Sequence, residues 1–252
     1  MSHERIIRKT PLEAAEECGR FMLATLGERI ANGEVATLAV SGGTTPKLLF
    51  HFMAAQAFDW SNVHLFWVDE RGVPPEHEQS NYRLAREHFI DPAGFPSANV
   101  HRIHAELEAK QAAARYRDEL REFFKLDPLR NDMPGFDVVQ QGMGADAHTA
   151  SLFAGEPLIE SHGVAAAVWV EKMNQWRITL LPGALLSAKS NAMLITGADK
   201  GPALRQIFGE EQDPLQWPTQ LIVNGGGEVK WFVDEAAAAG VDWLHAGYSI
   251  QP

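Results

Sequence analysis

One segment of the chain brings an imidazole, a carboxylate and two glycines close together. Residues 142–151 read Gly-Met-Gly-Ala-Asp-Ala-His-Thr-Ala-Ser and follow an apolar run. His148 can act as a general base near neutral pH, and Asp146 can orient or polarise it. The backbone around Gly142 and Gly144 can supply N–H donors to a developing oxyanion. The segment predicts proton-transfer chemistry, against the alternative of a structural histidine.

A second segment, residues 41–45, reads Ser-Gly-Gly-Thr-Thr and has the composition of a phosphate-binding turn. Glycines expose backbone N–H groups, and the N-terminus of a following helix directs its positive dipole end at an anion. The segment is neither a GxGxxG fingerprint nor a Walker A loop, because no Gly-Lys-Ser/Thr follows. The competing interpretation is a tight turn in which Thr45 caps a helix and Pro46 is its first residue.

The third segment, Asp69-Glu70-Arg71, places two carboxylates and a guanidinium after another apolar run. Arginine is the side chain best shaped to grip a phosphate or carboxylate with two hydrogen bonds. A surface ion pair is the alternative interpretation.

All three segments are predicted to follow the carboxyl ends of strands. The predicted strands are 35–40, 63–68, 100–103, 136–141, 164–170, 192–196, 221–223 and 229–233, with 177–181 as a strand or a helix entry; the predicted helices are 11–30, 47–56, 81–89, 106–124, a short one near 148–153, 200–208 and 234–239. This alternation predicts an α/β fold with an open, mostly parallel, doubly wound sheet and helices on both faces. Because ligands bind at the carboxyl ends of such strands, the three segments should converge on one crevice.

Length and charge narrow the function classes. We expect residues 1–252 to form a single α/β domain. The formal net charge of −11 disfavours nucleic acid and acidic membranes as partners. No apolar run approaches the roughly 18 residues that span a bilayer, and the first ten residues lack an apolar leader. We therefore expect a cytoplasmic protein with no nucleic-acid, membrane or obligate protein partner.

Metal and redox chemistry are not expected. Cys18 is the single cysteine, so neither an intrachain disulfide nor a Cys-rich zinc site can form. The ten histidines form no HExxH or His-x₃-His pattern, so we expect a metal-free site. No GxGxxG follows the strand at 35–40, so NADP is not an expected cofactor, and we expect none.

Several segments along the chain carry a resemblance to a known family. These are Ser41-Gly-Gly-Thr-Thr-Pro46, Asp69-Glu-Arg71 with Ser80-Asn-Tyr82, residues 142–153, Arg177-Ile-Thr179, residues 197–200 and Trp231-Phe-Val-Asp-Glu235. In content and order they resemble the 6-phosphogluconolactonase family, within a group of sugar-phosphate isomerase-like folds that also holds aminosugar-phosphate deaminases. The resemblance covers roughly residues 10–240.

The resemblance implies hydrolysis of 6-phospho-D-glucono-1,5-lactone, a small phosphorylated sugar lactone, in the oxidative pentose phosphate pathway. It makes His148 the proton-transfer residue and assigns Asp146 and Arg71 to the catalytic group beside it. The implied substrate-binding residues are Ser41, Gly42, Gly43, Thr44, Asp69, Gly144, Arg177 and Lys200.

Two positions depart from the family pattern. Ala147 stands where the family usually has glycine, and Ala154 stands where a proline commonly follows the Leu-Phe pair. If position 147 needs a positive φ, alanine costs on the order of 1 kcal/mol there. Both departures bear on loop geometry and leave the ionisable groups in place.

Two other functions remain as alternatives. Aminosugar-6-phosphate deaminases use a glutamate five residues beyond the histidine and an aromatic after the acidic strand end, whereas this chain has Phe153 and Arg71. Sugar-phosphate-sensing modules of transcription regulators need a DNA-binding segment. Only about ten residues precede the first predicted helix, and the chain is acidic, so neither room nor charge favours that interpretation.

Overall fold

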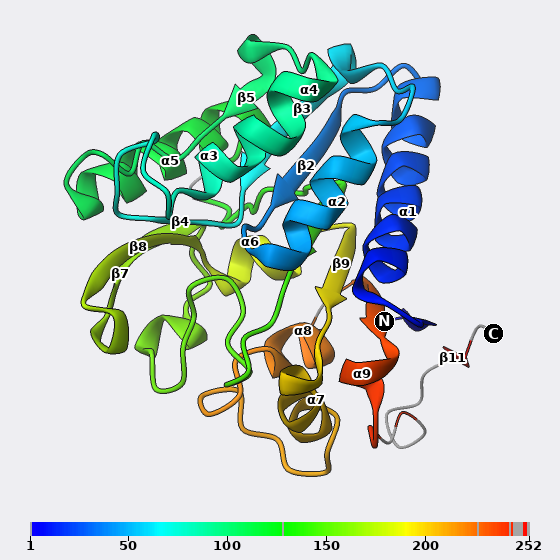
Figure 1. Ribbon diagram of the computed structural model, residues 1–252. Coiled ribbons are helices and arrows are strands. Elements are labelled where there is room, and N and C mark those ends of the chain that lie inside the picture. Colours follow the sequence, from blue (N-terminus) through cyan, green and yellow to red (C-terminus); the bar gives the residue numbers. More distant parts are fainter. Residues whose placement is uncertain (1, 128, 226, 242, 244–248, 251–252) are drawn as a thin grey trace.

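The computed structural model describes residues 2–127, 129–225, 227–241, 243 and 249–250. Its strands are β1 (Ser2–Arg8), β2 (Ala36–Val40), β3 (Val63–Trp67), β4 (Asp69–Arg71), β5 (Val100–His101), β6 (Val138–Gln141), β7 (Ala165–Val170), β8 (Gln175–Leu180), β9 (Ser190–Ile195), β10 (Glu228–Asp234) and β11 (Ser249–Ile250). Within these residues an open eight-stranded sheet runs β11-β1-β10-β9-β6-β2-β3-β5, and every neighbouring pair is parallel (Figure 1). A separate antiparallel sheet has the order β4-β8-β7.

Helices cover both faces of the parallel sheet. The helices are α1 (Pro11–Ala31), α2 (Thr44–Ala54), α3 (Asn81–Ala85), α4 (Asp91–Ala93), α5 (Ala109–Phe124), α6 (Pro182–Leu186), α7 (Gly201–Ile207), α8 (Gln220–Gly225) and α9 (Glu235–Ala238), with a π-helical turn at Arg86–Ile90 and short 3₁₀ turns at Trp60–Asn62, Ser97–Asn99, Pro157–Glu160, Glu171–Met173 and Ala198–Lys200. Phe66 of β3 contacts Phe123 of α5, with ring centroids 5.1 Å apart, whereas the next residue, Trp67, contacts Tyr82 of α3 at 5.6 Å. Successive residues of a strand point to opposite faces, so α5 and α3 lie on opposite sides. The predicted fold class is confirmed.

The first helix is built as its sequence predicts. Thr10 Oγ1 accepts a hydrogen bond from the Glu13 backbone N–H, and the Glu13 carboxylate accepts one from the Thr10 N–H, each at 3.2 Å. This capping box fixes the start of α1, which then buries Cys18, Met22 and Leu26 and lies beside α2 in Figure 1. The predicted helix at 11–30 is confirmed.

The sheet changes direction between β2 and β6. After β2 the chain forms β3, which pairs with one edge of β2. On the other edge β2 pairs with β6, and β6 pairs in turn with β9. The loops that leave the carboxyl ends of β2 and β6 therefore diverge. A crevice at this point is where open α/β sheets bind their ligands.

The small antiparallel sheet was not predicted as such. For residues 177–181 the sequence allowed either a strand or the entry to a helix. Most of them lie in β8, which forms a hairpin with β7. The segment Asp69–Arg71 is itself a strand, β4, which pairs antiparallel with β8 so that Arg71 stands opposite Arg177. Two segments over 100 residues apart in sequence are thereby fixed side by side.

The short helix predicted near 148–153 is wrong. This stretch is an irregular loop with one isolated bridge, Thr149 to Leu152. Ala147 and Ala150 adopt positive φ angles of 60° and 52°. Left-handed residues interrupt a right-handed helix, which explains why the loop does not become one.

Two further differences concern the C-terminal third and the N-terminus of the chain. The predicted strand at 221–223 is wrong, because these residues lie inside α8. A three-residue apolar run does not distinguish a buried strand from a helix turn. The structure also adds β1, which pairs in parallel with β10 and was not predicted.

Ala147 generates a stability prediction. Its side chain is buried, and its carbonyl accepts hydrogen bonds from the Thr219 N–H at 3.0 Å and hydroxyl at 2.7 Å, which hold the left-handed residue in place. Relief of about 1–2 kcal/mol of left-handed strain offsets the lost methyl burial of about 0.8 kcal/mol. We expect Ala147→Gly to leave the free energy of unfolding in urea unchanged or higher.

The matched control is Ala24→Gly, at an exposed position inside α1. It should lower the free energy of unfolding by about 1 kcal/mol. Equal destabilisation by both substitutions would contradict the strain assigned to Ala147.

Candidate active site

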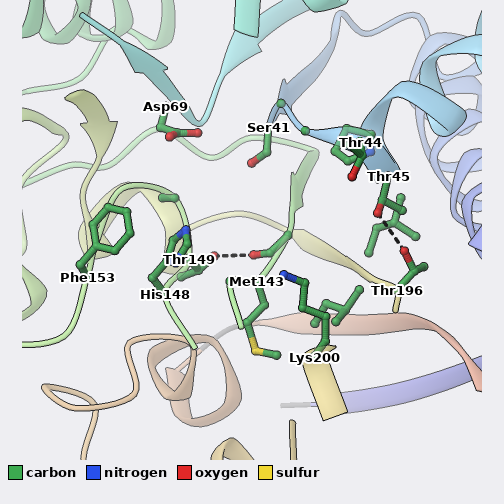
Figure 2. A pocket seen from close by; sticks show the side chains of 18 of the residues that line it. Ser41, Thr44, Thr45, Asp69, Met143, His148, Thr149, Phe153, Thr196 and Lys200 are labelled. Carbon is green, nitrogen blue, oxygen red and sulfur yellow. Dashed lines mark hydrogen bonds between the residues drawn. The ribbon is translucent and has the colours of Figure 1, made fainter. Parts of the chain in front are cut away.

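A pocket of about 330 Å³ opens at the carboxyl ends of β2, β6 and β9. The predicted site residues that line it are Ser41, Gly42, Gly43, Thr44, Asp69, Arg71, Gly144, His148, Arg177 and Lys200. Of the predicted residues, Asp146 alone does not line the pocket; it contacts His148 instead. In Figure 2, His148 and Phe153 lie on one side of the pocket, and Thr44, Thr45 and Thr196 lie on the other. The three segments therefore converge on one crevice.

His148 is held by a short hydrogen bond to Asp146. The Nδ1 and Oδ1 atoms are 2.5 Å apart. The hydrogen bond from His148, together with the ammonium of Lys172, holds the pKa of the Asp146 carboxyl well below its usual range. An ionised Asp146 accepts, so Nδ1 carries the proton and Nε2 of the neutral ring is left as the base.

Gly144 makes room for this pair. A Cβ at position 144 would lie 2.0 Å from His148 Nδ1, so only glycine fits. The Gly144 N–H donates to the His148 carbonyl at 2.8 Å and thereby closes the loop. That N–H is already engaged, so the oxyanion role expected for it from the sequence does not fit. Gly144 instead shapes the loop that carries His148.

The opposite side of the pocket is the N-terminus of α2. Gly43, with φ 129°, is the N-cap residue, and no side chain among the described residues caps this helix. The alternative interpretation, in which Thr45 is the cap, is therefore wrong: its hydroxyl lies 2.8 Å from that of Thr196. Uncapped first-turn N–H groups at the positive end of a helix dipole suit an anion.

Close packing explains the first glycine of this turn. A Cβ on Gly42 would lie 1.8 Å from Asn81 Oδ1. The Ser41 hydroxyl is buried and has no hydrogen-bond partner among the described residues. The Ser41 hydroxyl is therefore available to a ligand.

Lys200 reaches the pocket from the loop that follows β9. It is paired with Asp199 at 3.2 Å, and its side chain is 24% exposed. The loop turns at Gly197, where φ is 100° and the N–H donates to the buried Asp234 carboxylate at 3.0 Å. In Figure 2, Lys200 lies to the left of Thr196 and is one of the residues that line the pocket.

Two arginines face each other across β4 and β8. Arg71 and Arg177 are register partners, and both line the pocket. Arg71 Nη1 donates a hydrogen bond to the Gln79 carbonyl at 2.5 Å. Arg177 Nη1 lies 4.0 Å from Oδ2 of the Asp69 carboxylate. Burial lowers the pKa of Arg177. In the described part of the chain, both Nε atoms are buried without a partner. Adjacent, incompletely paired guanidiniums attract an anion or a developing oxyanion.

The two carboxylates of the third segment have different roles. Asp69 lines the pocket and accepts a hydrogen bond from the Ser151 hydroxyl at 2.7 Å. Glu70 points into the protein, accepts hydrogen bonds from the N–H groups of Asn81 and Tyr82, each at 2.7 Å, and holds the start of α3. Burial raises the pKa of Glu70. Only Asp69 is therefore available to substrate.

Sequence reasoning missed several residues of the site. Thr196, Phe153 and Met173 line the pocket, Ser151 binds Asp69, and Lys172 contacts Asp146. Ser151 and Phe153 lie inside the recognised segment 142–153; Phe153 served there only to separate the lactonase from the deaminase, and neither residue was predicted to contribute to the site. Lys172 lies 26 residues from Asp146 and carried no signal.

Two other kinds of site were sought in the part of the chain that the structure describes. No group of three or more His, Cys, Asp or Glu side chains is arranged to hold a metal ion. No described helix is long and apolar enough to cross a membrane.

Comparison with known proteins places the chain in a family. Residues 9–231 match the family described as glucosamine-6-phosphate isomerases/6-phosphogluconolactonase. The chain is 38% identical over 209 residues to a 6-phosphogluconolactonase of Synechocystis sp. The aligned region covers 82% of this chain and 85% of that protein.

Solved structures agree. The chain is 30% identical to a structure described as devB protein, with a TM-score of 0.86 and coverage of 95% of this chain and 100% of that one. It is 28% identical to a 6-phosphogluconolactonase from Shewanella baltica, with a TM-score of 0.79 and coverage of 93% and 97%. The resemblance drawn from the sequence is confirmed: this chain belongs to the family of glucosamine-6-phosphate isomerases and 6-phosphogluconolactonases.

Proposed function

We propose that this protein hydrolyses 6-phospho-D-glucono-1,5-lactone to 6-phospho-D-gluconate in the pentose phosphate pathway. The observation that carries the proposal is the pairing, in one pocket, of a histidine base with an uncapped helix N-terminus. His148 with Asp146 suits attack by water on an ester carbonyl, and α2 with Lys200 suits a phosphate. The relatives of known activity named above support this substrate.

The reaction needs one base that later acts as an acid. His148 Nε2 takes a proton from water while the water oxygen bonds to the lactone carbonyl carbon, which places negative charge on the carbonyl oxygen. Arg71, which lines the pocket, faces this oxyanion. When the tetrahedral intermediate collapses, the bond to the ring oxygen breaks, and Nε2–H returns its proton to that oxygen. General acid–base catalysis of this kind contributes roughly 10²–10⁴-fold.

The phosphate anchors the substrate. We place it against the backbone of Gly42, Gly43 and Thr44, with Lys200 and Arg177 as its cations. The phosphate lies far from the reacting carbonyl, so its role is to orient the lactone, and Asp69 is placed to bind a sugar hydroxyl.

The deaminase alternative is not favoured. Phe153 occupies the position of the glutamate that those relatives use, and its ring centroid lies 4.2 Å from that of His148. An aromatic ring in this place supplies no proton-transfer group. Glucosamine 6-phosphate should therefore release no ammonia with this enzyme.

We further propose that the chain acts as a single domain in the cytoplasm, without an obligate protein partner or a cofactor. Lactone hydrolysis changes no oxidation state, so the reaction requires no NADP, and His148 supplies the base and the acid that the two proton transfers need.

The first test is His148→Ala. We expect kcat for freshly generated 6-phosphogluconolactone to fall by at least about 100-fold, because the base and acid are lost together. The assay couples the product to 6-phosphogluconate oxidation with a chelator present and subtracts spontaneous hydrolysis.

His162→Ala, at an exposed position outside the pocket, is the matched control and should keep wild-type kcat. Near wild-type turnover in His148→Ala would remove His148 from the mechanism. A wild-type rate no greater than the spontaneous background would refute the lactonase proposal itself.

The second test separates anchoring from chemistry. Lys200→Met should raise KM about 10–100-fold, the value of one charge-assisted hydrogen bond, and change kcat by less than about threefold. Lys110→Met, at an exposed position on α5, provides the control for a lost positive charge. A large fall in kcat with unchanged KM would show that Lys200 takes part in the chemical step.

A further inference from the structure

A lysine outside the pocket lining contacts both neighbours of His148. Lys172 lies in the 3₁₀ turn Glu171–Met173, which connects β7 to β8. Its ammonium contacts Asp146 Oδ2, while Asp146 Oδ1 accepts the hydrogen bond from His148 Nδ1. One carboxylate therefore joins the hairpin to the imidazole.

The second contact is with Phe153. The Lys172 ammonium lies 4.2 Å from the centroid of the Phe153 ring, and that ring packs on His148 at 4.2 Å with an interplanar angle of 31°. Lys172 thus reaches the imidazole by two routes, through a carboxylate and through an aromatic ring. It does not line the pocket itself, so it acts through other groups and not on substrate.

The ion pair between Lys172 and Asp146 is a poor source of stability. Their side chains are 49% and 44% exposed, and exposed pairs contribute at most about 1 kcal/mol. The positive charge of Lys172 is more consequential for His148. Asp146 must accept the hydrogen bond from His148 without binding the imidazolium too tightly. An imidazolium held by an unopposed carboxylate is a weaker acid, because it gives up its proton less readily, so less of the neutral ring that can accept a proton is present at neutral pH.

We propose that Lys172 is a positioning residue for the His148–Asp146 pair: it fixes the Asp146 carboxylate against Nδ1 and offsets its charge, so that His148 is available as a base at neutral pH. This inference rests on the proposed function. The other charged groups that line the pocket are Asp69, Arg71, Arg177 and Lys200, and none of these four forms an ion pair or a hydrogen bond with Asp146. Lys172 is therefore the counter-charge assigned to this carboxylate.

The experiment compares Lys172→Met, which keeps the aliphatic chain, with Lys172→Arg, which keeps the charge. For Lys172→Met we expect the acid limb of the kcat–pH profile to move up by about half to one pH unit, the effect of one nearby charge in a largely solvated site. KM should stay within about twofold, since substrate is not touched. Lys172→Arg should restore the wild-type profile.

Lys230→Met is the matched control. Lys230 likewise pairs with a carboxylate, Glu4 at 2.8 Å, and lies 4.7 Å from the centroid of Phe21, but outside the pocket. Lys230→Met removes a positive charge from the same kind of contact as Lys172→Met, and it should leave the kcat–pH profile unchanged.

A titration of the His148 imidazole by NMR makes the result independent of catalysis. Lys172→Met should move the titration midpoint in the same direction as the acid limb. If this shift occurs in a protein that hydrolyses no lactone, the positioning role stands and the proposed function fails. An unshifted midpoint, or a raised KM with an unshifted profile, would overturn the positioning role.

Discussion

The parallel pairing of β2 with β6 is the constraint on which the site depends. Leu38 and Ala39 are in register with Val138 and Val139, so the loops that leave both strands start side by side. A buried carboxylate fixes this register: Asp137 accepts hydrogen bonds from the Thr37 N–H and hydroxyl at 2.9 and 2.8 Å. From that fixed point one loop leads to the α2 N-terminus and the other to His148. The sheet thus fixes where both loops start, and contacts such as the hydrogen bond from the Gly144 N–H to the His148 carbonyl fix the loop that carries His148.

The second sheet completes the pocket from outside the main fold. β4 and β8 bring Arg71 and Arg177 together, and the turn before β8 brings Lys172 to Asp146. Positive charge is therefore concentrated in a protein whose net charge is −11. A strongly acidic surface with a local basic pocket admits a small phosphorylated substrate and disfavours larger polyanions.

The sequence predicted what depends on local pattern. The capping box at Thr10 and the apolar runs before residues 41 and 142 located the helices and strand ends, and the strand ends located the site. The departure at Ala147 predicted a strained position if φ is positive, and φ is 60°. These features are written within a few residues of chain, so no tertiary contact is needed to find them.

The remaining features depend on contacts between distant segments. The pairing of Arg71 with Arg177 follows from a sheet whose strands lie over 100 residues apart, and the Gly144 N–H is taken by the His148 carbonyl, which only the closed loop shows. The helix α8 was mistaken for a strand because its apolar residues are too few to show a period.

The central claim is that one crevice holds the phosphate at the α2 N-terminus and presents the lactone carbonyl to His148. The most direct measurement is a structure with the product, 6-phosphogluconate, bound. The account predicts the phosphate against the backbone of residues 42–44 and Lys200, with the carboxylate of the product within hydrogen-bond distance of His148 Nε2. A reversed product, with its phosphate at His148 and its carboxylate at the α2 N-terminus, would contradict it.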